Sequence, residues 1–502
     1  MSTEITQPGT AQFQAALAIV EKLRSAGHEA YLAGGCVRDL LLGHAPKDYD
    51  VATSAPPDVV LAMFDRTFAV GAHFGVVLVA TPALADDPNL AEAEGSNPDR
   101  YIKTEVATFR SDGAYSDGRH PDAVRYTLSA EEDVRRRDFT INGLLLDPLL
   151  QRPLLLDPLL LDPLKGTGFS PYIHSAQTPG ALAPEGTAVI DHVGGLADLQ
   201  AGILRAIGRP ESRFEEDHLR MLRAVRFASR FSFEIEANTK RAIRILAPKT
   251  AAVSRERVRD ELTRMLTEGR ARHAFELLDE TGLLPEVLPE IARMHGVEQP
   301  PQYHPEGDVW IHTLGLLAQL EPGCSPTLAW GALLHDVGKP ATFRRAPDRI
   351  RFDGHVEVGM AIAADILRRF RFSNEDTHQI LTLVENHMRF ADSGRMRAST
   401  LKRFFRLQSF DEHLALHRMD CLAGSGNLDH WQFVRDRWMA MPEETVHPTP
   451  LLTGRELIAA GYQPGPAFKL MLRAVEDAQL EGAIATQEEA MRFVAEKFPP
   501  VP

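Results

Sequence analysis

The 502-residue sequence has few cysteines and no long apolar segment. Its three cysteines, Cys36, Cys324 and Cys421, lie far apart and form no C-x-x-C pair, which argues against a disulfide framework and a zinc ribbon. No apolar run approaches the roughly 20 residues that a membrane helix needs. The first residues also lack the basic and apolar regions of a secretory signal. We therefore expect reduced cysteines and a cytoplasmic protein without membrane segments.

An overall positive charge is also missing, because the net charge is −14. The distribution matters more than the total for a protein that binds nucleic acid. Between Arg213 and Arg272 there are 15 Lys or Arg against 9 Asp or Glu. A basic patch of this kind is the electrostatic footprint expected for contact with a phosphate backbone. The alternative is a solvated helical surface without a ligand.

The stretch from Tyr31 to Thr53, YLAGGCVRDLLLGHAPKDYDVAT, places Asp48 and Asp50 one residue apart behind a glycine-rich turn. An apolar run follows Asp50, so both carboxylates are expected near the start of a strand, where residues two apart share a face. Magnesium prefers a few carboxylates plus substrate phosphates, and two such ions activate a hydroxyl and stabilise a leaving pyrophosphate. The pattern predicts metal-dependent nucleotidyl transfer with catalytic Asp48 and Asp50. The alternative is a solvated turn.

The glycines ahead of these carboxylates suit a triphosphate. Gly34 and Gly35 allow the backbone to approach an anion closely, and the helix expected after them points its positive end toward it. Arg38 can add a positive charge at the same place.

The run EEDHLR contains a pair suited to reading a base. Cytosine and adenine both present an amino donor beside a ring-nitrogen acceptor, whereas uracil and guanine present a carbonyl beside an N–H. An Asp that accepts and an Arg that donates therefore fit C and A. Asp217 and Arg220 are three residues apart, which predicts one helix face. Arg223 follows on the same stripe, and the alternative is a surface salt bridge.

The run RRRDFTIN offers further groups for a nucleotide. Guanidinium groups such as Arg137 suit a triphosphate, and Asp138 and Asn142 can meet ribose hydroxyls. The alternative is a helix start capped by Asp or Thr. Glu105, in the expected strand TEVATFR, is a further candidate for supporting the metal site.

These motifs, GGCVRDLLLG, KDYDVAT, RRRDFTINGLLLDP and EEDHLRMLRAVRFASRF, resemble in order and content the class II tRNA nucleotidyltransferase and bacterial poly(A) polymerase superfamily. The resemblance implies that E-D-x-x-R serves as a protein template for base choice. It implies ribose and phosphate roles for Arg137, Asp138 and Asn142. It also implies Mg²⁺ in the head, with tRNA, CTP and ATP as partners.

The segment from Thr108 to Pro121, TFRSDGAYSDGRHP, is rich in Gly, Asp, Ser and Pro and is predicted to be a loop. It resembles the flexible loop with which CCA-adding enzymes switch from CTP to ATP. Its YSDGRHP form is more similar to that of CCA-adding members than to that of poly(A) polymerases.

A second group of residues has the chemistry of a metal site. Histidine nitrogens and carboxylates spread along a chain can converge on a divalent ion, although an isolated helical histidine is usually not a ligand. The string HDVGKP and the histidines and aspartates around it resemble the HD phosphohydrolases that are fused to some of these enzymes. The resemblance implies a site for a divalent transition metal or Mg²⁺, and Lys339 could contact a phosphate. The expected ligands are His312, His335, Asp336 and Asp420, with His355 and His387 for a second ion.

The sequence predicts an α+β protein in which a small mixed α/β head precedes helical segments. LLLDP occurs three times from Leu144 onward, and the proline-rich segment that follows is read as an insertion of unknown role. The expected parts are the head (1–148), the insertion (149–187), the end of the head with a helical neck (188–287), the HD domain (288–445) and a helical tail (446–502).

Together, these patterns predict a CCA tRNA nucleotidyltransferase whose HD domain is a metal-dependent phosphohydrolase in RNA 3′-end repair. Two alternatives within the class are a poly(A) polymerase and an enzyme that adds only A. An alternative of another class is an HD phosphohydrolase with a head that merely binds RNA. The sequence predicts no particular oligomeric state.

Overall fold

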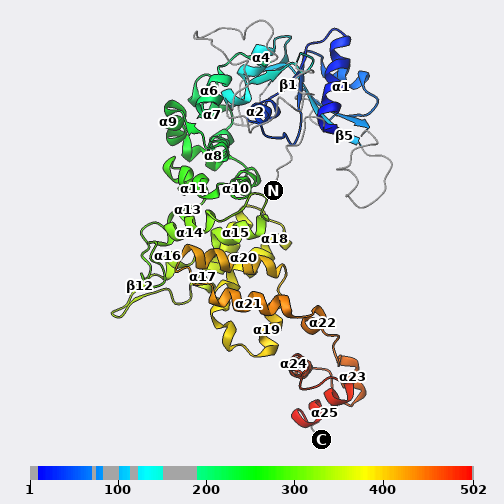
Figure 1. The fold of residues 1–502 in the computed structure, drawn as a ribbon, viewed down its shortest axis with the longest axis vertical. Helices are drawn as coiled ribbons and strands as arrows, with labels where there is room; N and C mark the ends of the chain where they lie inside the picture. The colour runs from blue at the N-terminus through cyan, green and yellow to red at the C-terminus, as the bar shows by residue number, and fades with distance from the viewer. Residues whose placement is uncertain (1–9, 70–74, 83–100, 114–122, 151–188, 500–502) are drawn as a thin grey trace, which may run out of the picture. The chain divides into compact units, whose positions relative to one another are not determined.

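The computed structural model describes residues 10–69, 75–82, 101–113, 123–150 and 189–499 (Figure 1). Within these ranges, no helix combines the length and apolar character that crossing a membrane requires. Most of the expected insertion at 149–187, most of an expected surface insertion after Thr81, and residues 114–121 of the expected loop lie outside the described residues.

The chain forms two compact units, Met1–Val253 with Thr281–Leu283, and Ser254–Glu280 with Leu284–Pro502. The first unit contains a seven-stranded mixed sheet in the order β3-β4-β5-β2-β1-β8-β9. Only β2 and β5 pair in parallel there; the other pairs are antiparallel. The predicted mixed α/β head is therefore confirmed. The strands of this sheet are β1 (Ala30–Ala33), β2 (Val51–Thr53), β3 (Thr67–Phe68), β4 (Val76–Pro82), β5 (Tyr101–Thr108), β8 (Leu144–Leu146) and β9 (Val189–Asp191).

Helix α1 (Ala11–Ser25) covers part of the sheet by packing against β1 and β5. Thr10 caps it by accepting a hydrogen bond from the Phe13 N–H. Apolar side chains recur at helical spacing from Phe13 to Leu23 and are buried, as their periodicity predicts.

The segment from Thr108 to Pro121 is not entirely loop. Residues Arg110–Asp112 form strand β6, which pairs antiparallel with β7 (Val124–Tyr126). The polar composition suggested a turn, but the paired backbone supplies the hydrogen bonds that a strand needs. The loop expectation is therefore wrong for Arg110–Asp112.

Helices complete the first unit. Helix α4 (Ala130–Arg135) begins after a Ser129 cap, and the helices from α6 onward form the first part of the expected neck. The helices that complete the unit are α2 (Gly35–Leu41), α3 (Pro57–Met63), α4 (Ala130–Arg135), η3 (Thr140–Asn142), α6 (Gly195–Ala201), α7 (Pro210–Glu216), α8 (Leu219–Phe231), α9 (Ala237–Leu246) and η5 (Ala247–Ala252), with the short pair β10 (Ile203–Leu204) and β11 (Glu234–Ile235).

The division between the units does not coincide with the expected boundary at residue 287. Helices α10 (Arg255–Thr267) and α11 (Ala271–Glu280) belong to the second unit. The indole Nε1 of Trp330 donates to the Thr263 hydroxyl at 2.9 Å. The helices α10 and α11 pack on α15 and α14, which come later in the chain. The sequence of α10 and α11 alone does not identify these partners.

The second unit is helical apart from one hairpin. Its core helices meet pairwise, α14 with α15 and α20, and α18 with α15 and α17. The elements are α12 (Leu284–Val287), α13 (Pro289–Ala292), α14 (Val309–Leu317), α15 (Pro326–Leu334), α16 (Lys339–Thr342), β12 (Arg344–Arg345), β13 (Ile350–Arg351), α17 (His355–Arg369), α18 (Asn374–Asn386), η6 (His387–Arg395), α19 (Ala398–Phe405), α20 (Phe410–Ala423), α21 (Asp429–Ala440) and α22 (Glu443–Val446).

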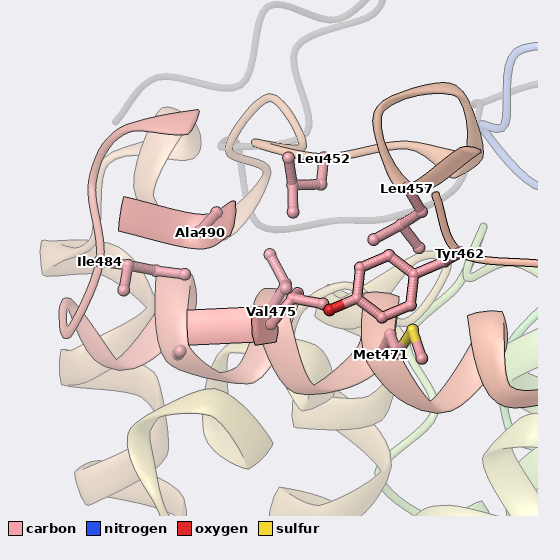
Figure 2. Packing of buried hydrophobic residues seen from close by; sticks show 9 residues of the cluster. Leu452, Leu457, Tyr462, Met471, Val475, Ile484 and Ala490 are labelled. Atoms are coloured by element: carbon pink, nitrogen blue, oxygen red, sulfur yellow. The ribbon is translucent and has the colours of Figure 1, made fainter. Parts of the chain in front are cut away.

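The expected helical tail has a small core of its own. It comprises α23 (Gly454–Ala459), α24 (Pro466–Glu481) and α25 (Gln487–Lys497). Side chains from all three helices point toward one another around Tyr462 and Val475 (Figure 2). Arg403 of α19 forms ion pairs with Glu476 and Asp477 of α24, which fixes this core against the preceding helices.

Candidate functional site

An acidic cluster forms where β2 begins in the head sheet. Val51 lies opposite Val106 in the parallel pair, so the residues just before them, Asp50 and Glu105, are neighbours on adjacent strands. Burial and the negative charges of Glu105 and Asp48 raise the pKa of Asp50 to about 6. Crowded carboxylates of this kind are stabilised by a divalent cation with oxygen ligands. Asp48 and Asp50, with Glu105 next to Asp50 on the neighbouring strand, therefore fit Mg²⁺.

Gly34 brings the backbone of the turn close to Arg137. It has φ +75°, a conformation that favours glycine, and a Cβ there would lie 3.0 Å from Nη1 of Arg137. Helix α2 begins at the next residue, Gly35. The structure thus places the two glycines and Arg137 together, as the triphosphate hypothesis requires.

Arg38 lies at the glycine turn, as expected, but its guanidinium is bound by other groups of the protein. Its side chain is buried, and Nη1 donates to the Asn142 Oδ1 atom at 2.5 Å. Nε donates to Asp39 at 2.8 Å, and the guanidinium lies over the rings of Phe227 and Phe231. Because these partners occupy the guanidinium, Arg38 is placed to orient Asn142 and the helix α8 that carries both rings.

Asn142, Asp138 and Arg223 continue this chain of contacts. Asn142 Nδ2 donates to Asp138 Oδ1 at 2.9 Å, and Arg223 donates to Asp138 Oδ2 through Nε at 2.9 Å and Nη2 at 2.8 Å. Burial opposes ionisation of Asp138, but the charge of Arg223 and the hydrogen bond from Asn142 lower its pKa to about 2. The carboxylate is therefore charged and fixed between the head and α8.

Asp217 and Arg220 do not share one helix face. Asp217 has an extended backbone between α7 and α8, and its Oδ1 accepts the Leu219 N–H at 3.0 Å. Arg220 lies in the first turn of α8 and donates to Glu216 Oε2 at 2.6 Å. The helical interpretation of the i, i+3 spacing is wrong, because Asp217 ends α7 with an extended backbone and lies before the first residue of α8.

Two residues near these sites were missed by the sequence analysis. Arg226 continues the three-residue spacing of Arg220 and Arg223 on α8, and its guanidinium lies 4.3 Å from the Phe227 ring centroid. Asp133 is buried and binds Arg137 at 3.0 Å. The regular arginine spacing was a usable signal for Arg226. Asp133 gave no comparable signal.

The histidines and aspartates of the expected HD domain converge in the second unit. One ligand atom from each of His312, His335 and Asp420 lies within 4.8 Å of the others. The same holds for Asp336, His355 and His387. Gly338 allows the chain near Asp336 to approach His355, because a Cβ at this position would clash with the His355 carbonyl oxygen at 2.1 Å. We call these six residues the histidine–aspartate cluster.

Asp336, a member of the second trio, also faces the first. Its Oδ2 is 3.1 Å from His335 Nε2 and 3.9 Å from His312 Nε2. Its Oδ1 is 3.9 Å from His355 Nε2 and 3.8 Å from His387 Nε2. One carboxylate therefore faces both groups, an arrangement suited to two ions that share a ligand.

The hydrogen bonds of three histidines prepare them as ligands. In His335, His355 and His387, Nδ1 contacts the backbone carbonyl three residues earlier, at 2.9, 3.0 and 2.7 Å. A carbonyl only accepts, so the proton is assigned to Nδ1 and the lone pair to Nε2. All three Nε2 atoms are buried without a hydrogen-bond partner. Buried, unpartnered nitrogens that face one carboxylate fit a divalent transition metal.

His312 is held by carboxylates on both sides. Its Nδ1 contacts Glu306 Oε1 at 2.7 Å, and its Nε2 contacts Asp420 Oδ1 at 3.0 Å. Burial opposes protonation, but these hydrogen bonds raise the pKa of His312 to about 9. A metal ion at Nε2 would replace this proton. Glu306 and the adjacent His304 were missed because single polar residues in HPEGD carry no spacing signal.

Lys339 does not point freely toward a substrate. It is buried, and its Nζ lies 2.7 Å from Asp336 Oδ2 and 2.7 Å from Gln299 Oε1. Its charge therefore helps to hold the pKa of Asp336 well below the usual range, against the effect of burial. The hypothesis of a phosphate contact is replaced by a role in fixing Asp336.

Three family models match the chain. The "Poly A polymerase head domain" covers residues 30–168, and the "Probable RNA and SrmB-binding site of polymerase A" covers residues 232–294. A tRNA nucleotidyltransferase domain 2 model covers residues 355–495.

Similar proteins match over nearly the whole chain. A CCA-adding enzyme of Lactobacillus gasseri is 30% identical over 489 residues, which cover 95% of this chain and 96% of that protein. The chain belongs to the class II CCA-adding enzyme family. It is therefore a nucleotidyltransferase. An A-adding tRNA nucleotidyltransferase of Deinococcus radiodurans is 31% identical over 485 residues, which cover 93% of this chain and 94% of that protein.

Other comparisons with this family differ in coverage. A CCA-adding enzyme of Geobacillus thermodenitrificans is 37% identical, but the match spans 54% of each chain. The crystal structure of the Bacillus stearothermophilus CCA-adding enzyme in complex with CTP has a TM-score of 0.66 and 26% identity. It covers 97% of this chain and 99% of that one. The family membership and the α+β fold are thus established, whereas the chemistry of the histidine–aspartate cluster is a separate question.

Proposed function

We propose that this chain adds C, C and A to the 3′ end of tRNA from CTP and ATP without a nucleic-acid template, in the cytoplasm. The observation that carries the proposal is the carboxylate cluster of Asp48, Asp50 and Glu105, in a chain of the CCA-adding family. Mg²⁺ ions held there would activate the terminal hydroxyl of the tRNA and stabilise the leaving pyrophosphate. The glycine turn at Gly34 and Arg137 would bind the triphosphate.

Base choice would rest on the junction of α7 and α8. Asp217 supplies an acceptor for the exocyclic amine of C or A, and Arg220 a donor for the ring nitrogen. Asp138 fixes Arg223 in a two-point contact, and Arg38 fixes Asn142. These contacts would hold α8 against the head. The base-recognising groups of Asp217 and Arg220 would then keep a fixed position relative to Asp48 and Asp50 in the same unit.

Stepwise extension tests this proposal. Purified protein is incubated with tRNA that ends before CCA, after C or after CC, and with one labelled triphosphate at a time. We expect CMP on the first two substrates and AMP on the third. An enzyme that adds only A, the activity named for the Deinococcus relative, would label only the third. A poly(A) polymerase would extend all three with many A residues.

Asp217→Ala is expected to relax the choice of C and A over U and G. One lost base-edge contact of about 1 to 3 kcal/mol corresponds to a loss of discrimination of roughly 5- to 150-fold. The measurement is competitive incorporation of CTP against UTP. Glu215→Ala is the matched control, because Glu215 is a nearby exposed carboxylate that contacts Lys249 at 3.2 Å. A fall in total activity with unchanged UTP misincorporation would refute the template role.

The Mg²⁺ requirement of nucleotide addition is expected to depend on pH through Asp50. Its raised pKa of about 6 means that the metal-binding, ionised form is lost as the pH falls below that value. Between pH 7 and pH 5 the Mg²⁺ concentration for half-maximal rate should rise about tenfold, since protons and metal compete. Mg²⁺ titration at each pH measures this. An unchanged half-maximal concentration would contradict the assignment of Asp50.

We also propose that the histidine–aspartate cluster is a metal-dependent phosphohydrolase site. The support is the set of three buried, unpartnered Nε2 atoms around Asp336, completed by His312 and Asp420. A divalent ion bound there would polarise a phosphoryl oxygen and lower the pKa of a bound water. Lys339 contacts Asp336 and fixes the position of its carboxylate in this site.

A substrate class follows from the presence of both sites in one chain. A tRNA whose 3′ end carries a 3′-phosphate or a 2′,3′-cyclic phosphate lacks a free 3′ hydroxyl and cannot accept CMP. Attack of water on phosphorus with cleavage of the bond to the 3′ oxygen would restore that hydroxyl, leaving inorganic phosphate in the first case and a 2′-phosphate in the second. We therefore propose RNA 3′-end repair, tested with 2′,3′-cyclic nucleotides and with tRNA that ends in a cyclic phosphate.

A further inference from the structure

A basic hairpin lies next to the histidine–aspartate cluster. It comprises β12, β13 and their turn, residues 344–351, and β12 pairs antiparallel with β13. Four of its eight residues are arginine and one is aspartate, although the whole chain is acidic. Arg344, Arg345 and Arg349 are between 61% and 66% exposed. The hairpin therefore presents a concentrated positive charge to solvent.

The hairpin is connected to the cluster at both ends and along one side. Helix α16, which starts at Lys339, runs directly into β12, and β13 is followed closely by His355. Arg345 forms an ion pair with Glu298. The next residue, Gln299, accepts a hydrogen bond from Lys339, which contacts Asp336. Figure 1 shows the hairpin projecting from the body of the second unit beside α16 and α17.

The exposure of the ligands shows where the cluster opens. The side chains of His312, His335, Asp336 and His387 are fully or almost fully buried. His355 and Asp420 are 13% and 21% exposed. Solvent therefore reaches the cluster at these two residues, and His355 follows β13 closely in the chain.

The arginines can exchange their present partners for phosphates. Their ion pairs are with carboxylates that are themselves exposed, Asp353, Glu298 and Asp348. Exposed pairs of this kind are weak, whereas arginine binds phosphate through two parallel hydrogen bonds. The exposed rings of Tyr303, which precedes His304, and Phe343, which precedes β12, can stack on unpaired bases.

We propose that the basic hairpin binds the backbone of a single-stranded RNA 3′ end and directs its terminal phosphoester to the histidine–aspartate cluster. The direction toward the cluster rests on the proposed phosphohydrolase activity. The buried ligands favour a strand end over a duplex, since only an end can enter at His355 and Asp420. The hairpin would thus give preference to RNA over mononucleotides.

The test compares two double variants of the full chain. Arg344→Ala with Arg345→Ala removes charge from the hairpin. Arg368→Ala with Arg371→Ala is the matched control, because these arginines are also highly exposed and paired with single carboxylates. Arg368 lies 13 residues after His355 in α17, about 20 Å along the helix. The substrates are a single-stranded RNA of about 12 nucleotides ending in a 2′,3′-cyclic phosphate, and 2′,3′-cyclic AMP.

The hairpin variant should raise the KM for the RNA about tenfold and leave the KM and kcat for cyclic AMP unchanged. For this variant, the slope of the logarithm of the RNA-binding constant against the logarithm of the salt concentration should be smaller by about 1.4, since two phosphate contacts are lost. The control variant should match the wild type. An unchanged KM for RNA, or equal effects on both substrates, would overturn the inference.

If the wild type hydrolyses neither substrate, the phosphohydrolase proposal fails while the hairpin remains testable. Fluorescence anisotropy with the same labelled RNA then decides. Weaker binding by the hairpin variant than by the control supports an RNA contact. Equal affinity of the two variants overturns it.

Discussion

Asp50→Ala is expected to lower CMP incorporation by about a thousandfold or more, and Asp48→Ala should have a comparable effect. Each substitution removes one of the adjacent carboxylates that fit the head metal. Metal ions contribute several kcal/mol of transition-state stabilisation, and about 4 kcal/mol corresponds to a factor of 1000 in rate. Single-turnover incorporation of labelled CTP into tRNA lacking CCA measures the effect.

A suitable control for these variants is Asp65→Ala, which removes an exposed carboxylate of the same unit just before β3. It should retain normal incorporation. The Asp48 and Asp50 variants should also keep any hydrolysis by the histidine–aspartate cluster, because the two sets of ligands belong to different units. Near-normal CTP incorporation by either variant would refute the catalytic assignment.

His335→Ala combined with Asp336→Ala is expected to abolish metal-dependent phosphoester hydrolysis, with a loss of at least about a hundredfold. The substitutions remove one unpartnered Nε2 and the carboxylate that faces both trios. Turnover of 2′,3′-cyclic nucleotides and the metal content of the purified protein measure the effect. CTP incorporation should remain.

His413→Ala is the control for the loss of a buried histidine. His413 lies on α20, as does Asp420, but outside the histidine–aspartate cluster. It should keep its metal content and turnover, with thermal denaturation used to compare folding. Wild-type protein without bound transition metal and without metal-stimulated turnover of any phosphoester would refute the site.

The sequence predicts the head most accurately where apolar periodicity is strong. The expected strand TEVATFR overlaps β5, and the apolar run after Asp50 forms β2. The mixed sheet could be expected, but its strand order depends on pairings between distant segments. The division between the two units differs from the expected boundary at residue 287 for the same reason, because the packing partners of α10 and α11 lie far along the chain.

Local spacing misled the interpretation of Asp217 and Arg220. They have helical spacing, but the backbone leaves the helix at Asp217, whose carboxylate accepts the Leu219 N–H. The motif predicts that Arg38 adds a positive charge beside Gly34 and Gly35. Its partner Asn142 lies 104 residues away in the sequence, so only the folded chain shows that the Arg38 guanidinium is buried and bound to Asn142.

The histidine–aspartate cluster was easier to anticipate because its residue types are themselves chemical signals. The structure brings all six expected ligands together. The sequence could not show that Asp336 faces both trios, nor that Lys339 is bound to it. Those features depend on side-chain directions across five helices. The role of the cluster in hydrolysis stays a prediction.

The most direct test of the account is the 3′-end sequence that the purified protein makes. A tRNA lacking its last three nucleotides is incubated with all four triphosphates and Mg²⁺, and the products are sequenced. We predict ends that read CCA and stop there, with loss of extension in the Asp50→Ala variant. A homopolymeric A tail, an end without added C, or unchanged extension by that variant would contradict the account.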